Sequence, residues 1–142
     1  ISLLVIITVL ISTHANSEQS AEDIIKNRKA LFSKNYNTAK KVQSLSSSGD
    51  FDGAKKLMLE MSENYKNLKE MFPDNTKEGF KTEVTALVWE EKDKFNSLME
   101  KSSNDMIELA SIIENSDNIR GSLGKLMWSN CKACHSKYRL PH

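Results

Sequence analysis

The sequence predicts an all-α protein, an antiparallel up-and-down four-helix bundle. Apolar residues after Ser17 recur at spacings of three and four without sustained alternation, which indicates amphipathic helices rather than strands. The 142 residues include only five Gly and two Pro, too few for a loop-rich all-β domain. The periodic pattern falls into four long segments with mostly short connections, which is typical of such bundles.

The first helix is expected to begin at Ser20, because Asp23 follows three residues later as a capping signal. The polar cluster at residues 46–50 ends it. A second helix follows and stops before Pro73, because proline disfavours helix at the preceding residue. Residues 73–82 are expected to form the longest loop. The apolar stripes of these two helices are Ile24, Ile25, Leu31, Phe32, Tyr36, Ala39, Val42 and Leu45, then Phe51, Ala54, Leu57, Met58, Met61, Tyr65 and Leu68.

A third helix is expected over residues 83–114 and a fourth over residues 117–139, after a break at 115–117. Gly121 and Gly124 lie inside the fourth helix, where each costs about 1 kcal/mol relative to Ala. Their spacing indicates either close approach of a neighbouring helix or bound group, or a less regular helix. The stripe of the third helix is Leu87, Val88, Phe95, Leu98, Met99, Met106, Leu109, Ile112 and Ile113.

The first segment of the chain has the pattern of a targeting signal. Residues 1–11 carry no charge, and this apolar run is shorter than the about 20 residues that span a bilayer. Thr13 and Ala15 precede a cleavage point after Ala15, so residues 1–15 are expected to be a secretory signal peptide and residues 16–142 the mature domain. Because the sequence does not begin with Met, the basic region that precedes such a run is expected to be missing. An uncleaved membrane anchor and a buried core helix are the alternatives, whereas cleavage and export predict a periplasmic chain without a stable anchor.

Composition excludes several other classes of protein. The net charge is +1, from 20 Lys and Arg against 19 Asp and Glu, whereas a nucleic-acid binder is expected to carry a basic stripe. Two Cys cannot build a disulfide-dense scaffold. No motif places a nucleophile beside a base or two carboxylates together, so no enzymatic activity is predicted.

The most specific chemistry lies near the C-terminus. Residues 131–135 read CKACH, a CxxCH motif on the last predicted helix. Residues at i, i+3 and i+4 share one face of a helix. Cys131 and Cys134 can each add to a vinyl group on one porphyrin edge, and the imidazole of His135 can reach the iron. The motif therefore predicts one haem c, bound covalently through two thioethers, with His135 as an iron ligand.

Other interpretations of the motif are weaker. A redox-active cysteine pair expects a βαβ context, which the helical pattern does not provide. A zinc site needs a fourth ligand, and the spare His142 is terminal. A chance CxxCH in a helical structural protein is the third alternative. If the motif binds haem, the sequence does not decide whether the sixth position of the iron is empty or filled by Lys or Met. The Met residues are Met58, Met61, Met71, Met99, Met106 and Met127.

The motif and its position resemble cytochrome c′ and the class II c-type cytochromes, and cytochrome c′ is itself a standard example of the up-and-down bundle. The most specific match is residues 131–139, CKACHSKYR, which are close to the family's CxxCHxxYR ending. Residues 24–32, IIKNRKALF, form a second match. An apolar–Trp pair before a Phe at residues 88–95 forms a third. The resemblance extends over about residues 22–139.

The match on the first helix implies the state of the iron. In this family an Arg is followed four residues later by the side chain over the distal haem face, and Arg28 and Phe32 occupy these positions. Low-spin relatives carry an iron-ligating Met there, whereas high-spin cytochromes c′ carry a non-ligating residue. A phenyl ring has no lone pair for iron, so the resemblance implies a five-coordinate haem with His135 as the sole protein ligand. Arg28 is expected near a haem propionate, with a solvated helix-face cation as the alternative.

Three further residues are expected at the haem. The resemblance places Arg139 by the proximal side, with a simple helix C-terminal cation as the alternative. Phe72 and Trp89 are expected as walls of the haem pocket, or else as ordinary core residues. Trp128 departs from the family, because a small residue is common three positions before Cys131.

These features predict a haem protein that binds NO, and CO more weakly. Phe32 cannot donate a hydrogen bond, on which bound O₂ depends more than NO or CO does, and distal polarity and access decide what a haem does. One-electron transfer with an unidentified redox partner is the second expected activity. The alternatives are a low-spin electron-transfer cytochrome with a Met or Lys sixth ligand and a non-haem helical interaction module. Such cytochromes are often homodimers through the first two helices, so a second copy is also an expected partner.

Overall fold

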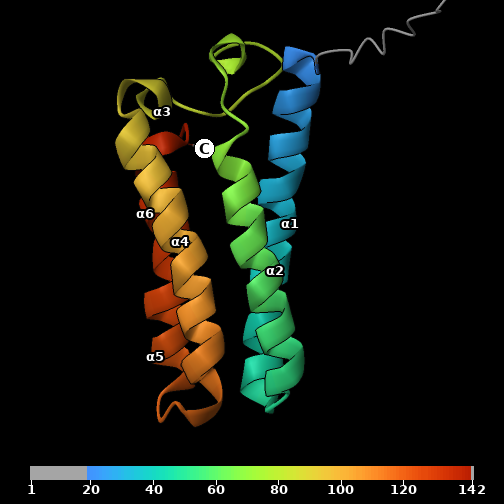
Figure 1. Cartoon of the computed structure of the whole chain (residues 1–142), viewed down its shortest axis with the longest axis vertical. Coiled ribbons are helices and arrows are strands. Elements are labelled where there is room, and N and C mark those ends of the chain that lie inside the picture. The colour runs from blue at the N-terminus through green and yellow to red at the C-terminus, as the bar shows by residue number, and fades with distance from the viewer. Residues whose placement is uncertain (1–18, 142) are drawn as a thin grey trace, which may run out of the picture.

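A computed structural model describes residues 19–141 and confirms the four-helix bundle (Figure 1). The second helix packs along both the first and the third, and the fourth packs mainly on the third. The expected signal peptide lies outside the described residues. Within residues 19–141, no helix is long and apolar enough to cross a membrane. The elements are α1 (Ala21–Ser48), α2 (Phe51–Lys69), η1 (Asp74–Thr76), α3 (Leu87–Glu90), α4 (Lys92–Ile112), η2 (Ile113–Asn115), α5 (Ile119–Leu123), the π-helical turn η3 (Gly124–Trp128) and α6 (Ser129–Tyr138).

The predicted boundaries of the first helix are confirmed by its caps. The Ser20 hydroxyl oxygen accepts a hydrogen bond from the backbone N–H of Asp23 at 3.2 Å, and the hydroxyl donates to the Asp23 carboxylate at 2.8 Å. Gly49 ends α1 with φ of 83°, a left-handed conformation that favours glycine. Asp50 then caps α2 by accepting from the Gly53 N–H at 3.0 Å.

The expected third helix, residues 83–114, is wrong at its start. Val84 and Arg139 form an antiparallel β-bridge, and the Leu140 N–H donates to the Glu83 carbonyl at 2.7 Å. This pairing satisfies the backbone groups in an extended conformation, so helix begins only at α3. The same pairing ends α6 one residue before Arg139, whose φ and ψ of −116° and 141° are extended.

The fourth helix is not a single regular α-helix. This confirms one of the two interpretations of Gly121 and Gly124, a less regular helix. Its middle turn, η3, is π-helical, and such turns change the backbone hydrogen-bond pattern. The side-chain amide of Asn130 donates to the Leu126 carbonyl at 3.0 Å, and the Ser129 hydroxyl donates to the Lys125 carbonyl. Side chains therefore supply hydrogen bonds where the helix changes pitch.

The two glycines do not mark close approach of another helix, and that expectation is wrong. A Cβ on Gly121 would lie 2.4 Å from the side-chain nitrogen of Asn118, whose side chain caps α5 by accepting from the Gly121 N–H. A Cβ on Gly124 would meet no atom within 4 Å. The first glycine therefore makes room for a cap, and the second faces open space.

The core runs the length of the bundle and follows most of the predicted stripes. Ile112 and Tyr36 are the exceptions, because they are 38% and 52% exposed. The Tyr36 ring packs edge-on against Trp128 at 6.1 Å, and the Lys40 ammonium lies 4.7 Å from its ring centroid. Five of the six Met residues are buried, and the first four of them lie on the predicted apolar stripes: Met58, Met61, Met99, Met106 and Met127.

Candidate functional site

The CxxCH motif lies on the regular helix α6, so its residues keep the expected helical spacing. Cys131 and Cys134 are one turn apart, and both are free thiols of intermediate burial. Cys134 packs against the hydrophobic core, whereas His135 is exposed. The described part of the chain therefore has no disulfide between these cysteines, and no group of three or more His, Cys, Asp and Glu in residues 19–141 is placed to hold a metal ion.

Both thiols are partly buried, and α2 packs against them. Burial raises the pKa of the Cys134 thiol to about 12 and also raises the pKa of Cys131. The hydroxyl of Tyr65, on α2, is hydrogen-bonded to Cys131, and burial together with the two sulfurs raises the pKa of Tyr65. Both sulfurs are consequently protonated at neutral pH, with α2 packed against the motif.

Aromatic rings connect α1 to α6 at this end of the bundle. Phe72, just after α2, lies 4.7 Å from Phe95 and 6.0 Å from Trp89 between ring centroids. Phe32 contacts Phe72 at 6.3 Å, and Phe95 contacts Tyr138 at 5.2 Å. All four pairs are edge-to-face, which is a favourable geometry. The structure thus brings together Phe32, Phe72 and Trp89, as expected. Sequence reasoning did not single out Phe95 and Tyr138, although both lie in the segments that carry the family resemblance.

Arg28 is completely buried, so the solvated-cation alternative is wrong. Its guanidinium donates to the Thr76 hydroxyl at 2.7 Å, the Thr76 carbonyl at 2.9 Å, the Thr82 hydroxyl at 2.7 Å and the Met71 carbonyl at 3.2 Å. Its central carbon also lies 4.7 Å from the Phe72 ring centroid. Burial lowers the pKa of Arg28 to about 10, which leaves it charged at neutral pH. The four terminal N–H groups are used by the protein, whereas the buried Nε has no protein partner among the described residues.

Arg139 lies outside the last helix, although the sequence predicts that this helix extends to residue 139. Because α6 ends at Tyr138, Arg139 does not continue the helical face of His135. Its guanidinium lies 3.6 Å from the Glu83 carboxylate instead. Arg139 thus follows the C-terminus of α6 in extended backbone, and its side chain pairs with the segment before α3.

The packing around Trp128, which the sequence left uncertain, is well defined. Its indole N–H donates to the Gln43 side-chain oxygen at 2.7 Å, which links η3 to α1. Together with the edge contact to Tyr36, this hydrogen bond fixes the ring between the two helices. The large side chain three residues before Cys131 is therefore accommodated at the seam between α1 and the last helix.

The site residues gather at one end of the bundle. Figure 1 shows the start of α1, the short α3 and the end of α6 at the same end, drawn at the top. That end combines two half-buried thiols one turn apart, an imidazole next to them, an aromatic cluster and a buried guanidinium with one unpaired N–H. This set fits a covalent haem: thiols for the vinyl groups, imidazole for iron, rings for the porphyrin and an N–H for a carboxylate.

Comparisons with known proteins agree with this chemistry. The family model described as "Cytochrome C'" matches residues 23–139. A cytochrome c' of Rhodopseudomonas palustris is 28% identical over 120 residues, which are 82% of this chain and 82% of that protein. The solved structure of cytochrome c' from Rubrivivax gelatinosus has a TM-score of 0.71 at 23% identity, covering 85% of this chain and 98% of that chain.

A second solved structure adds a ligand to the comparison. It is a nitric oxide complex of a mutant cytochrome c prime from Alcaligenes xylosoxidans, with a TM-score of 0.73 at 17% identity, covering 87% of this chain and 99% of that chain. At such identities the structural likeness establishes the fold, whereas the family model spans most of the chain. The chain therefore belongs to the cytochrome c′ family, whose cofactor is a covalently bound haem c with iron.

Proposed function

We propose that this chain is a periplasmic c-type haem protein that binds NO and CO at an open distal haem face and also transfers single electrons. Cys131 and Cys134 form the thioethers, and His135 binds the iron. The bound haem iron supplies the gas-binding position and the one-electron couple. Export follows from residues 1–15 as a signal peptide, with residues 16–142 as the mature domain. The spacing of the two thiols and the imidazole on α6 supports this assignment.

The observation that carries the open distal face is the placement of Phe32. It lies on α1, one turn after Arg28, and packs edge-on against Phe72 in the aromatic cluster. Its side chain neither ligates iron nor donates a hydrogen bond, so a ligand on that face meets apolar surface. Small neutral diatomics that need no hydrogen-bond donor suit this environment. The nitric oxide complex of the Alcaligenes xylosoxidans relative is in line with the same ligand class.

Arg28 and its neighbours hold the haem in this proposal. The buried Nε–H of Arg28 is the donor left for a propionate, because the terminal N–H groups are already used by the loop. Phe72 and Trp89 form walls of the pocket. Arg139 pairs with Glu83 just after the end of α6, and its role at the proximal side of the haem is part of the proposal.

The visible spectrum of the reduced protein, with and without CO, tests the proposal. A high-spin spectrum that changes on addition of CO is the expected result. A sharp low-spin α-band that CO does not change would instead favour the electron-transfer cytochrome with a Met or Lys ligand. A colourless protein, after export with the haem-attachment machinery, would favour a non-haem interaction module.

Two sets of variants assign the residues. Cys131→Ala with Cys134→Ala is expected to leave no haem attached after acid-acetone extraction. Phe32→Met is expected to convert the spectrum toward low spin, because a thioether placed over iron can ligate it. Leu31→Met is the matched control, since it adds the same side chain at the neighbouring position on α1. If both Met variants stay high-spin, Phe32 does not lie over the iron.

A further inference from the structure

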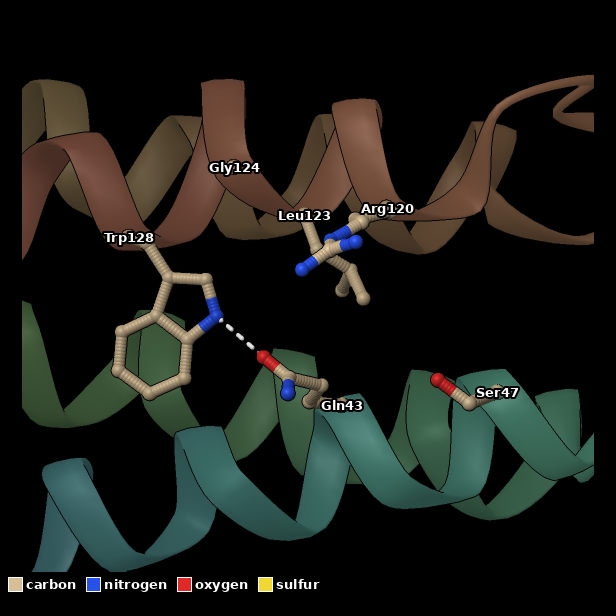
Figure 2. Close-up of a pocket in the computed structure, with 6 residues that line it drawn as sticks. All are labelled: Gln43, Ser47, Arg120, Leu123, Gly124 and Trp128. Atoms are coloured by element: carbon tan, nitrogen blue, oxygen red, sulfur yellow. Dashed lines mark hydrogen bonds between the residues drawn. The ribbon is translucent and has the colours of Figure 1, made fainter.

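A cavity opens at the seam between α1 and the last helix, on the side of Trp128 away from the CxxCH motif. Its volume is about 510 Å³, within the range of small-molecule sites. Figure 2 shows it bounded by α1 on one side and by α5 and η3 on the other. Its lining residues are Gln43, Ser47, Arg120, Leu123, Gly124 and Trp128.

Two of the polar side chains of the cavity are exposed donors that can exchange water for a ligand. Arg120 is its only charged lining residue, and no carboxylate lines it. Across the described chain, neither the Arg120 guanidinium nor the Ser47 hydroxyl has a side-chain hydrogen bond or ion pair. Figure 2 shows both groups facing the space between the helices. A guanidinium and a hydroxyl that line one cavity from opposite helices can both donate hydrogen bonds to a carboxylate.

Trp128 and Leu123 form the apolar part of the cavity lining, and a hydrogen bond holds the flat Trp128 ring in place. The Trp128 indole closes one end of the cavity, and its hydrogen bond to Gln43 fixes the ring plane (Figure 2). Leu123 is only 3% exposed and adds an aliphatic surface beside Arg120. Ring and aliphatic carbons arranged in this way suit an aromatic or otherwise flat apolar body.

Gly124 keeps the cavity open. Its φ and ψ of −60° and −47° are ordinary helical values, so the backbone does not require glycine. A Cβ there would meet nothing within 4 Å, so no neighbouring atom requires glycine either. Glycine in a helix interior is unfavourable compared with alanine. What its missing side chain leaves is space in the cavity.

We infer that this cavity binds a small carboxylate that carries a flat apolar body. The carboxylate lies between Arg120 and Ser47, and the apolar body lies against Trp128 over Gly124. The site is separate from the haem-binding residues and does not depend on gas binding.

Isothermal titration of the full haem-loaded protein with benzoate tests this inference. We expect saturable one-to-one binding with a Kd of about 1 mM, as befits so small a ligand. Arg120→Gln is expected to weaken it about tenfold or more by removing a charge-assisted pair. Lys125→Gln is the matched control, because Lys125 is an exposed cation on the adjacent turn that does not line the cavity. The visible spectrum is followed in parallel and should stay unchanged.

Two further arms address the apolar part of the site. Gly124→Leu is expected to abolish benzoate binding by filling the cavity, with the far-UV circular dichroism unchanged. Benzyl alcohol, with the ring but no charge, should bind about tenfold more weakly than benzoate. The inference is overturned if benzoate gives no saturable heat or if Arg120→Gln and Lys125→Gln behave alike. It is also overturned if binding survives in Gly124→Leu, or if it alters the haem spectrum.

Discussion

Two arginines of this bundle show how burial decides what a cation does. Arg28 is completely buried and gives its terminal N–H groups to Thr76, Thr82 and Met71. Arg120 is exposed at the cavity and donates to no side chain or carbonyl of the described chain. A buried charge is tolerated only when the protein satisfies it, whereas an exposed one is satisfied by water and can exchange that water for a ligand.

The same contrast separates the two regions in which they lie. Around Arg28 the Phe72 ring packs edge-to-face against Phe32 and Phe95, and hydrogen bonds from Arg28 attach the loop after α2 to α1. Around Arg120 the lining is incomplete, with a cavity beside a glycine. The residues around Arg28 are therefore held by contacts within the chain. Around Arg120, by contrast, hydrogen-bond donors and an open cavity are available to a ligand.

Replacing each arginine by alanine should separate the two roles most clearly. Arg28→Ala is expected to lower the free energy of unfolding by about 3 kcal/mol, because it leaves buried acceptors unpaired and removes the contact with Phe72. Arg120→Ala should change it by less than about 0.5 kcal/mol. Urea unfolding followed by circular dichroism measures both. Equal effects of the two variants would remove the distinction between a structural and an available arginine.

Arg28→Lys sharpens the same comparison. An ammonium has three donors and no planar fork, so it cannot serve the acceptors of Arg28 together. We expect it to recover less than half of the stability lost in the alanine variant. Full recovery would mean that charge alone, rather than hydrogen-bond geometry, matters at this position.

The next largest effect is expected between the two regions, where η3 joins α6. Asn130 is 4% exposed and donates to the Asp105 carboxylate at 2.7 Å as well as to the Leu126 carbonyl. Asn130→Ala should cost about 2 kcal/mol in the free energy of unfolding, because it removes a donor from a buried carboxylate. The exposed neighbour variant Ser129→Ala is the control and should cost much less. A similar loss in both would show that burial of the hydrogen bonds at Asn130 does not increase their contribution.

Sequence reasoning reached the parts of the fold that are encoded locally. The caps at Ser20 and Asp50 both involve residues three positions away. The cap at Ser20 was predicted, whereas Asp50 was assigned only to the polar cluster that ends the first helix. The environment of Arg28 was not predictable, because its partners Thr76 and Thr82 lie 48 and 54 positions along the chain. The extended start of the third segment was missed for the same reason, since Val84 pairs with the far end of the sequence.

The candidate site divides in the same way. The CxxCH spacing is local, so the sequence alone placed the thiols and the imidazole on one helix. Arg139 was misplaced because pairing with the loop before α3 overrides helix propensity. The cavity at Gly124 was not predicted, because a glycine inside a helix has more than one interpretation. Whether it borders a cavity depends on how the opposite helix packs, which the sequence does not show.

The two glycines of the last helix give a smaller test with opposite signs. Gly124→Ala should raise the free energy of unfolding by about 0.5–1 kcal/mol, because it improves helix propensity without a clash. Gly121→Ala should lower it, because the new Cβ would lie 2.4 Å from the Asn118 side chain that caps α5. Thermal unfolding of the two variants beside the wild type measures both. Stabilisation by both would mean that the cap at Asn118 gives way at little cost.

The smallest effect on stability is expected from the ion pairs of Glu91 near the aromatic cluster, because Glu91 and its two lysine partners are all partly exposed. Lys137 and Lys94 lower the pKa of the Glu91 carboxyl by pairing with it, and Lys94 lies 3.2 Å away. A carboxyl group with a lowered pKa stabilises the folded chain at pH values above its ordinary pKa near 4.5. This contribution is lost as the pH falls through the lowered pKa.

The stability of Glu91→Gln should therefore differ from that of the wild type at neutral pH and approach it in acid, whereas the exposed Glu90→Gln should show no such approach. Comparing unfolding midpoints at both pH values decides this, and a pH-independent difference would mean that the Glu91 side chain acts through packing rather than charge. In contrast with Arg28, which has protein acceptors because it is buried, Glu91 keeps access to water and its pairing is correspondingly weaker.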